Sequence, residues 1–414
     1  MVSRRRTTNK KRRTGSKKAS QKKTARVGLV VFGLVFVGVL GFTLYRFFTS
    51  RHTHPPLLPI FEAYPSQGVE TKIKQIDRCI YDALLALNIP AGDVTFKTVE
   101  PKRDSEELWD FSELDILLPT PLPHNNFKEV FLSRLSEHIP KKSIQFASGS
   151  RQELILDLYI NRRHTHRLVF IKLREKKPAL LPPSSLPKVA IIIDDFGYDE
   201  KIASKFLVLD GVMSFSVLPH SPFQKSIATT IHHTGRDILL HLPMEPVEYP
   251  QVDPGAGALL SSMAPDDLLD QLRRNLDAVP FAVGVNNHMG SWLTQDPAKM
   301  RQIFTILKKR NLFFIDSLTS PRSCCQRAAR LLKLKFAQRH VFLDHVQDPN
   351  AIRFQIKRLI SIARKQGKAI GIGHPYPTTW EVLNEELPNI ESQVELVRFL
   401  SWWDSSKDLY SCLL

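Results

Sequence analysis

From residue 188 onward, short apolar runs alternate with longer segments in which apolar residues recur at helical spacing. Asp296-Pro297 and Asp348-Pro349 predict helix starts, and Gly367 predicts a helix stop. The alternation predicts a parallel α/β fold: a seven-stranded (β/α) barrel that is closed, distorted or incomplete, with a doubly wound open sheet as the alternative. The predicted strands are VAIII, MSFSVL, DILLHL, FAVGV, LFFID, HVFLD and AIGIGH.

The region before the barrel has a mixed pattern. Residues 68–177 contain two stretches of helical periodicity and, in ELILDLYINRRHTHRLVFIKL, two strands around a polar turn. This combination predicts a small α+β domain. Proline-rich segments border it, so we expect an extended spacer at 49–67 and a linker at 178–187. The barrel domain is then expected to span 188–414.

The N-terminus combines a basic tail with a long apolar segment. The 19 residues from Val27 to Tyr45 carry no charge, and at about 1.5 Å per residue a helix of this length reaches about 28 Å, close to the ~30 Å hydrocarbon thickness of a bilayer. This predicts a membrane helix over 27–48. A cleavable signal peptide is the alternative, but its apolar region is normally shorter and ends in a small-x-small site. Because Lys and Arg concentrate in 1–26, we expect the tail in the cytoplasm and the rest of the chain across the membrane.

The net charge of +17 is distributed unevenly. Residues 1–26 hold twelve Lys and Arg and no acidic residue, which leaves +5 for the other 388 residues. The folded part therefore has an ordinary surface charge, and we expect no nucleic-acid partner. The four cysteines have no CxxC spacing, so they predict neither a disulfide framework nor a zinc-finger type of site.

Nearly every predicted strand of the barrel ends in a side chain that can bind a metal or transfer a proton. Because the C-terminal ends of parallel strands share one rim, we expect these side chains to meet. The first strand ends in two adjacent carboxylates, Asp194 and Asp195, and such a pair is stabilised if one binds a divalent cation and the other lies near a water molecule. Carboxylate and imidazole ligands suit zinc or a similar metal. The strand-end residues are Asp194, Asp195, His220, His241, Asn286, Asn287, His288, Asp316, Asp344, His345 and His374.

Five motifs carry a resemblance to a known family: IIIDDFGYD, LLHLPMEP, GVNNHMGS, FFIDSLTS and GIGHPYPTT. Taken in this order, they closely resemble the divergent polysaccharide deacetylases, a distant branch of the carbohydrate esterases that remove N-acetyl groups from glycans. The resemblance covers about residues 186–400. It implies a metal-dependent hydrolase that releases acetate and leaves a glucosamine-type residue.

The resemblance also implies which residues hold the metal. Asp194 matches the catalytic base, Asp195 matches a metal ligand, and His241 matches the first of two ligand histidines. Glu245 stands where the better-known deacetylases have the second histidine, so either Glu245 or His288 completes the site. We expect His288, because it preserves the imidazole ligand.

Further residues are expected at the reacting amide and along the glycan. His374 matches the late family histidine that protonates the departing amine, and Asp316 is expected to orient His374 or to contact substrate. Asn287, Trp292 and Tyr376 lie close to the motifs and are expected to bind the sugar. Core packing explains either aromatic residue equally well.

Topology and resemblance together predict a single-pass inner-membrane protein of a double-membraned bacterium, with its barrel in the periplasm. The expected substrate is then peptidoglycan or another envelope glycan. Two alternatives stay open at this point. One is an inactive glycan-binding or scaffolding protein of the envelope that keeps the fold and the metal site. The other is a different metal-dependent hydrolase, such as an amidase that acts on peptide stems.

Overall fold

A computed structural model of the chain describes most residues between 69 and 403. They all belong to one compact unit, Pro59–Leu414. The expected basic tail (1–26), membrane helix (27–48) and spacer (49–67) lie outside the described residues. None of the helices within the described ranges has both the length and the apolar character that a membrane crossing requires. The described ranges are 69–87, 89, 93–104, 108–118, 127–136, 139–140, 143–148, 154–172 and 186–403.

The N-terminal part of the described chain forms a mixed sheet with strand order β1-β2-β5-β4-β3. Strands β2 and β5 pair in parallel, and the other neighbours pair antiparallel. The predicted polar turn between two strands lies at Asn161 and Arg162, which have φ values of 48° and 71°. The elements are α2 (Val69–Ala86), β1 (Val94–Arg103), β2 (Leu108–Leu118), α3 (Phe127–Ser136), β3 (Ile144–Ser148), β4 (Leu154–Ile160) and β5 (Arg163–Lys172).

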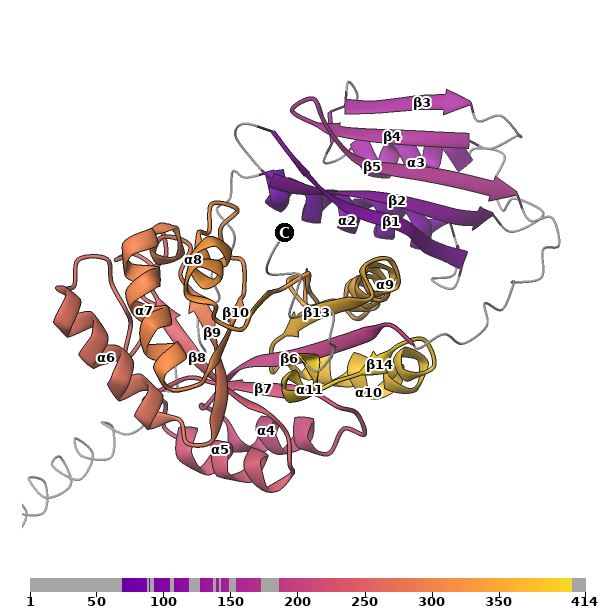
Figure 1. The fold of residues 1–414 in the computed structure, drawn as a ribbon. Coiled ribbons are helices and arrows are strands. Elements are labelled where there is room, and N and C mark those ends of the chain that lie inside the picture. Colours follow the sequence, from indigo (N-terminus) through magenta and orange to yellow (C-terminus); the bar gives the residue numbers. More distant parts are fainter. Residues whose placement is uncertain are drawn as a thin grey trace, which may run out of the picture. The chain divides into compact units, whose positions relative to one another are not determined.

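The strands from residue 188 onward form a curled parallel sheet with helices around it (Figure 1). Their order is β11-β10-β9-β8-β7-β6-β13-β12, and β14 also pairs with β6. The elements are β6 (Lys188–Phe196), α4 (Glu200–Leu207), β7 (Ser214–Val217), α5 (Gln224–His233), β8 (Ile238–Met244), α6 (Pro265–Ala278), β9 (Ala282–Met289), η3 (Leu293–Gln295), α7 (Pro297–Lys309), β10 (Phe313–Asp316), α8 (Cys325–Leu332), β11 (Phe336–Gln338), β12 (Val341–Phe342), α9 (Pro349–Gln366), β13 (Lys368–Gly373), α10 (Pro377–Glu391), β14 (Glu395–Leu396) and α11 (Phe399–Trp402).

The strand order has the winding of a barrel. From β6 to β11 the strands follow the chain in one direction, and β12 and β13 continue the same rotation back to β6. A doubly wound sheet instead reverses its order at a switch point. Because β11 and β12 form the two edges of this sheet, the fold is a half-barrel, consistent with an incomplete (β/α) barrel. Each of the seven predicted strands occurs, whereas β11 and β14, with three and two residues, had no pattern long enough to predict them.

Local signals in the sequence explain where the helices begin and end. The carboxylate of Asp296 accepts hydrogen bonds from the first free backbone N–H groups of α7, and Asp348 does the same for α9. Helix α9 ends at Gly367, whose φ of 82° favours a residue without a side chain. Strand β6 is buried on both faces, as expected of a parallel strand covered by helices.

The N-terminal sheet contacts helix α9 of the barrel. The aromatic rings of Phe96 in β1 and Phe354 in α9 meet edge to face at 4.8 Å, and Ser361 of α9 donates a hydrogen bond to the Phe96 carbonyl. Since all described residues form one compact unit, the boundaries expected for separate domains at 68–177 and 188–414 stay a prediction.

Candidate metal and catalytic site

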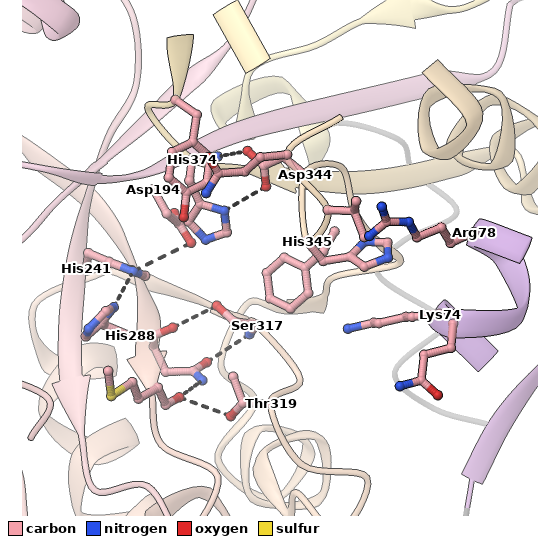
Figure 2. A pocket seen from close by; sticks show the side chains of 17 residues that line it. Lys74, Arg78, Asp194, His241, His288, Ser317, Thr319, Asp344, His345 and His374 are labelled. Atoms are coloured by element: carbon pink, nitrogen blue, oxygen red, sulfur yellow. Dashed lines mark hydrogen bonds and ion pairs between the residues drawn. The ribbon is translucent and has the colours of Figure 1, made fainter. Parts of the chain in front are cut away.

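The candidate site lies at the C-terminal ends of the parallel strands. Strand β6 supplies Asp194 and Asp195, and β8 supplies His241. Strand β9 supplies Asn286, Asn287 and His288, and His374 directly follows β13. Figure 2 shows several of these side chains around a common pocket. The strand-end rule therefore brings together side chains that lie far apart in the sequence.

An irregular backbone brings both adjacent carboxylates to one imidazole. Successive side chains of a strand normally point to opposite faces. Here the pairing of β6 with β7 shifts between Ile193 and Phe196, and Asp195 has a left-handed φ of 59°. As a result, His241 Nε2 lies 2.9 Å from Asp195 Oδ1 and 3.7 Å from Asp194 Oδ2. Such a conformation is found at sites whose surroundings hold it in place.

Asp195, His241 and His288 form a buried cluster with the donor set of a metal site. Asp195 Oδ1 lies 2.9 Å from His241 Nε2 and 3.0 Å from His288 Nδ1, and the two nitrogens lie 3.2 Å apart. Tetrahedral zinc with bonds of about 2.1 Å places its ligand atoms about 3.4 Å apart, slightly farther than these atoms lie. Neither carboxylate oxygen of Asp195 has a hydrogen-bond partner of good geometry among the described residues. A buried, ionised carboxylate needs such compensation, so these residues fit a divalent cation.

The charge on Asp195 follows from its neighbours. Burial alone raises the pKa of a carboxyl group, but the imidazoles of His288 and His241 outweigh it and hold the pKa of Asp195 well below its usual range. Asp195 is therefore ionised at neutral pH, as a metal ligand must be.

Asn286 fixes the orientation of His241 and of Asp194. Its amide oxygen lies 3.0 Å from His241 Nδ1 and also accepts a hydrogen bond from Ser216. Because an amide oxygen only accepts, His241 Nδ1 carries a proton, which leaves Nε2 as the ring atom that faces the cluster. The amide nitrogen of Asn286 donates to both oxygens of Asp194, each at 2.9 Å.

Asp194 has the properties of a general base. It is buried, lies beside the cluster and lines the pocket. Burial raises the pKa of Asp194, even though His241 and His374 act in the opposite direction. A carboxylate with a raised pKa holds an accepted proton more firmly, which suits proton abstraction near neutral pH.

His374 has the properties of a general acid. Its Nδ1 lies 2.8 Å from Asp344 Oδ1, and its backbone N–H donates to Asp344 Oδ2 at 2.6 Å. Thr379 donates a further hydrogen bond to Asp344 at 2.7 Å. Burial lowers the pKa of His374, but Asp344 outweighs it and raises the pKa to about 9. The imidazole is therefore protonated at neutral pH and lines the same pocket as Asp194.

The role expected for Asp316 in orienting His374 is wrong, because Asp344 makes that contact. Asp316 is fully buried, and its carboxylate accepts hydrogen bonds from Leu318 N at 2.9 Å and Ser323 Oγ at 2.7 Å. The strand order explains the difference. Strand β10, which carries Asp316, is separated by four strands from β13, the strand that precedes His374. Strand β12, which precedes Asp344, lies directly beside β13. Asp316 is also absent from the pocket wall, so it is not placed to contact substrate there.

Glu245 and the expected sugar-binding residues occupy different surroundings. The Glu245 carboxylate accepts a hydrogen bond from Ser261 N and lies outside the cluster of Asp195 and the two histidines. Asn287 and Tyr376 line the pocket, although the Asn287 amide is engaged with the backbone of Ser317 and Met289. Trp292 is 48% exposed and does not line the pocket.

The pocket has a volume of about 440 Å³, within the range of small-ligand sites. Besides the strand-end residues, it is lined by Lys74 and Arg78 of helix α2, about 120 residues earlier in the chain than Asp194. The sequence pattern of residues 68–177 alone predicts no function for this helix. One feature of the sequence indicates a shared position for these cations: Lys74 and Arg78 are four residues apart on an amphipathic helix, so they lie on the same face.

Fold and site together define a (β/α)-barrel type of protein with a metal-capable Asp-His-His cluster at the C-terminal rim. A sequence model of the divergent polysaccharide deacetylases matches residues 191–402. The chain belongs to the divergent polysaccharide deacetylase family.

The chain is also similar to individual proteins. The uncharacterized protein YibQ of Escherichia coli is 38% identical over 220 residues, which cover 53% of this chain and 68% of YibQ. An uncharacterized protein of Haemophilus influenzae is 35% identical over 220 residues, covering 53% of this chain and 78% of the relative. A crystal structure of an uncharacterized protein from Agrobacterium tumefaciens has a similar fold, with a TM-score of 0.51 and 21% identity over 54% of this chain and 91% of that one.

Proposed function

We propose that the protein is a metal-dependent hydrolase that removes N-acetyl groups from an envelope polysaccharide. The observation that carries the proposal is the arrangement of one pocket: a carboxylate with a raised pKa and a protonated imidazole flank a buried Asp-His-His cluster. Amide hydrolysis needs a base for the attacking water and an acid for the departing nitrogen. Asp194 and His374 are suited to these two roles.

The residues act in a simple order. Asp194, held by the amide of Asn286, takes a proton from the water that attacks the acetamide carbonyl. His374, held by Asp344, gives its proton to the amine nitrogen as the C–N bond breaks. Acetate and a free amino sugar are the products. Asp195, His241 and His288 would hold a divalent cation, which when bound would supply Lewis-acid polarisation of the carbonyl and lower the pKa of the attacking water. Two imidazoles and one carboxylate favour zinc.

The location expected for the protein limits the choice of substrate. The basic tail at 1–26 and the apolar segment at 27–48 support an inner-membrane anchor that leaves the barrel in the periplasm. Peptidoglycan is the abundant N-acetylated glycan within reach of such a protein. Family membership supports a polysaccharide substrate in general.

The test combines two measurements on the purified full-length chain: metal content by elemental analysis, and acetate release from N-acetylated chito-oligosaccharides and peptidoglycan fragments. We expect about one metal per chain together with acetate release. Asp194→Asn and His374→Gln should keep the metal and lose turnover. Metal without acetate would favour a glycan-binding or scaffolding role, and release of a peptide stem would favour an amidase. Absence of bound metal would refute the proposed site.

A further inference from the structure

Two cationic side chains of helix α2, Lys74 and Arg78, line the pocket that contains the proposed catalytic residues; we call them the cationic wall. Figure 2 shows them reaching toward the pocket from the helix, on the side away from His241 and His288. Since they stand four residues apart, they share one face of the helix. Arg78 is exposed, whereas Lys74 is half-buried and its Nζ is shielded from solvent, 5.6 Å from the centre of the Phe342 ring that also lines the pocket.

A buried ion-pair network holds the helix in this position. Asp77, which lies between the two cations in the sequence, is 2% exposed. Its carboxylate lies 3.0 Å from His166 Nε2 and accepts a hydrogen bond from Arg358 of α9 at 3.1 Å. Arg358 also donates to Asp110 of β2 at 2.7 Å. Breaking a buried network of this kind is costly, so the wall has a defined place beside the pocket.

The pocket has its carboxylates at one end, beside His241 and His374, and the cationic wall at the other, on helix α2; we call these the inner and the outer end. Among the described residues that line it, the carboxylates are Asp194 and Asp344, and both have partners at the inner end, Asn286 and His374. Arg78 lies 3.8 Å from Asp82, but both side chains are more than half exposed, and such surface pairs contribute little. Among the described residues that line the pocket, the outer end therefore carries two cationic side chains and no carboxylate.

His345 adds a neutral polar group between the two ends. Its Nδ1 is buried and has no hydrogen-bond partner in the part of the chain that the structure describes. Burial lowers the pKa of His345 to about 4, so the imidazole is neutral and can donate or accept one hydrogen bond. Lys74, Arg78 and His345 together resemble the mixed charged and neutral contacts that bind oxyanions.

We propose that the cationic wall binds an anionic group of the substrate, a carboxylate or a phosphate, so that the enzyme selects acidic N-acetylated glycans over neutral ones. This inference rests on the proposed function, because it assumes that the acetamido group lies at the metal cluster. A glycan whose reacting sugar occupies the inner end then extends toward Lys74 and Arg78. Electrostatic complementarity at that end contributes to substrate binding rather than to the chemical step.

The test uses chito-oligosaccharides of one length in three forms: unmodified, oxidised at C6 to carboxylates, and phosphorylated at C6. Acetate release by the full-length, zinc-loaded chain is compared with that of the Lys74→Met/Arg78→Gln double variant. We expect the variant to lose about tenfold or more in kcat/KM on an acidic form, through KM, and to keep its activity on the neutral form. The carboxylate and phosphate forms distinguish the two sources of charge. Lys72→Met, on the same helix but outside the pocket wall, is the matched control.

Equal losses on acidic and neutral forms, or no preference for acidic forms in the unmodified chain, would overturn the inference. Calorimetry measures the binding of the three glycan forms to the Asp194→Asn variant. This measurement tests the charge preference independently of the proposed reaction. If acidic forms bind more tightly and the double variant abolishes this preference, the inference stands even if no acetate is released. If acetate is released without any charge preference, the inference fails and the proposed reaction stands.

Discussion

Replacing Asp344 by Asn tests whether this carboxylate keeps His374 protonated. The Asp344 carboxylate lies 2.8 Å from His374 Nδ1 and accepts hydrogen bonds from the His374 backbone and from Thr379. An Asn side chain has nearly the same shape, and its amide oxygen can keep an accepted hydrogen bond. The substitution therefore removes the negative charge with little change in packing.

The size of the effect follows from the pKa of His374, which is about 9 against an ordinary value of 6.5. Burial lowers this pKa and Asp344 is the largest opposing cause, whereas Asp195 and Asp194 raise it less, so without Asp344 the pKa should fall back toward 6.5. A full return from about 9 to 6.5 corresponds to about 3.4 kcal/mol, which is the upper bound of the effect. At pH 8 the protonated fraction then falls about thirtyfold, whereas at pH 6 it changes by less than a factor of about 1.5.

The same shift predicts how stability depends on pH. Because the folded-state pKa of His374 lies above 6.5, its stabilising contribution is fully present below pH 6.5 and is lost as the pH rises through about 9. The Asp344→Asn variant lacks this contribution, so the difference in unfolding free energy between the two proteins should be largest near pH 6, shrink between pH 6.5 and 9, and be small above pH 9.

Two assays check the prediction for Asp344→Asn. Titration of His374 by NMR gives its pKa directly, and the pH profile of acetate release should show its alkaline limb moved to lower pH by about 2 units or more. Asp237→Asn serves as the control, since Asp237 is also buried but precedes β8 at the opposite end of the sheet. A His374 pKa that stays near 9 in the Asp344→Asn variant would refute the reasoning.

Three further predictions, which use four substitutions, test other parts of the structure. His288→Ala should remove most of the bound metal while Glu245→Ala retains it, and elemental analysis giving the reverse result would contradict the ligand set. Asn286→Leu should destabilise the fold by about 2–4 kcal/mol in urea unfolding, because it leaves several buried polar groups without partners; a loss below about 1 kcal/mol would show that those groups find other partners. Gly284→Ala places a methyl group against the ring of Phe313 and should destabilise by about 1–3 kcal/mol, an expectation that unchanged thermal unfolding would contradict.

The part of the site that the sequence predicts is the part that depends on strand ends. Asp194, His241, His288 and His374 each end or follow an apolar run, and parallel strands in one sheet place such residues on a common rim. That argument needs only local periodicity and the parallel direction of the strands. It does not need the order of the strands or their register.

The contacts that the sequence does not predict depend on order and register. Asn286 lies opposite His241 in the pairing of β8 with β9, and Asp344 reaches His374 because β12 lies beside β13. The run HVFLD predicts strand β12, but it does not predict that this strand pairs with β13. Lys74 is still harder to predict, because helix α2 lies far from the barrel strands in the sequence and only tertiary packing brings it to the pocket.

The two adjacent carboxylates that end the apolar strand β6 have different surroundings, and these surroundings give them different roles. Asp195 faces the imidazoles of His288 and His241, which hold its pKa well below the usual range, whereas Asp194 faces the neutral amide of Asn286, and burial raises its pKa. A pair of carboxyl groups whose pKa values are moved in opposite directions can supply a permanent anion and a proton acceptor at one site. The left-handed backbone at Asp195 is what allows both to reach the same imidazole. Adjacency in the sequence is therefore a means of placing a ligand and a base at one metal-capable cluster.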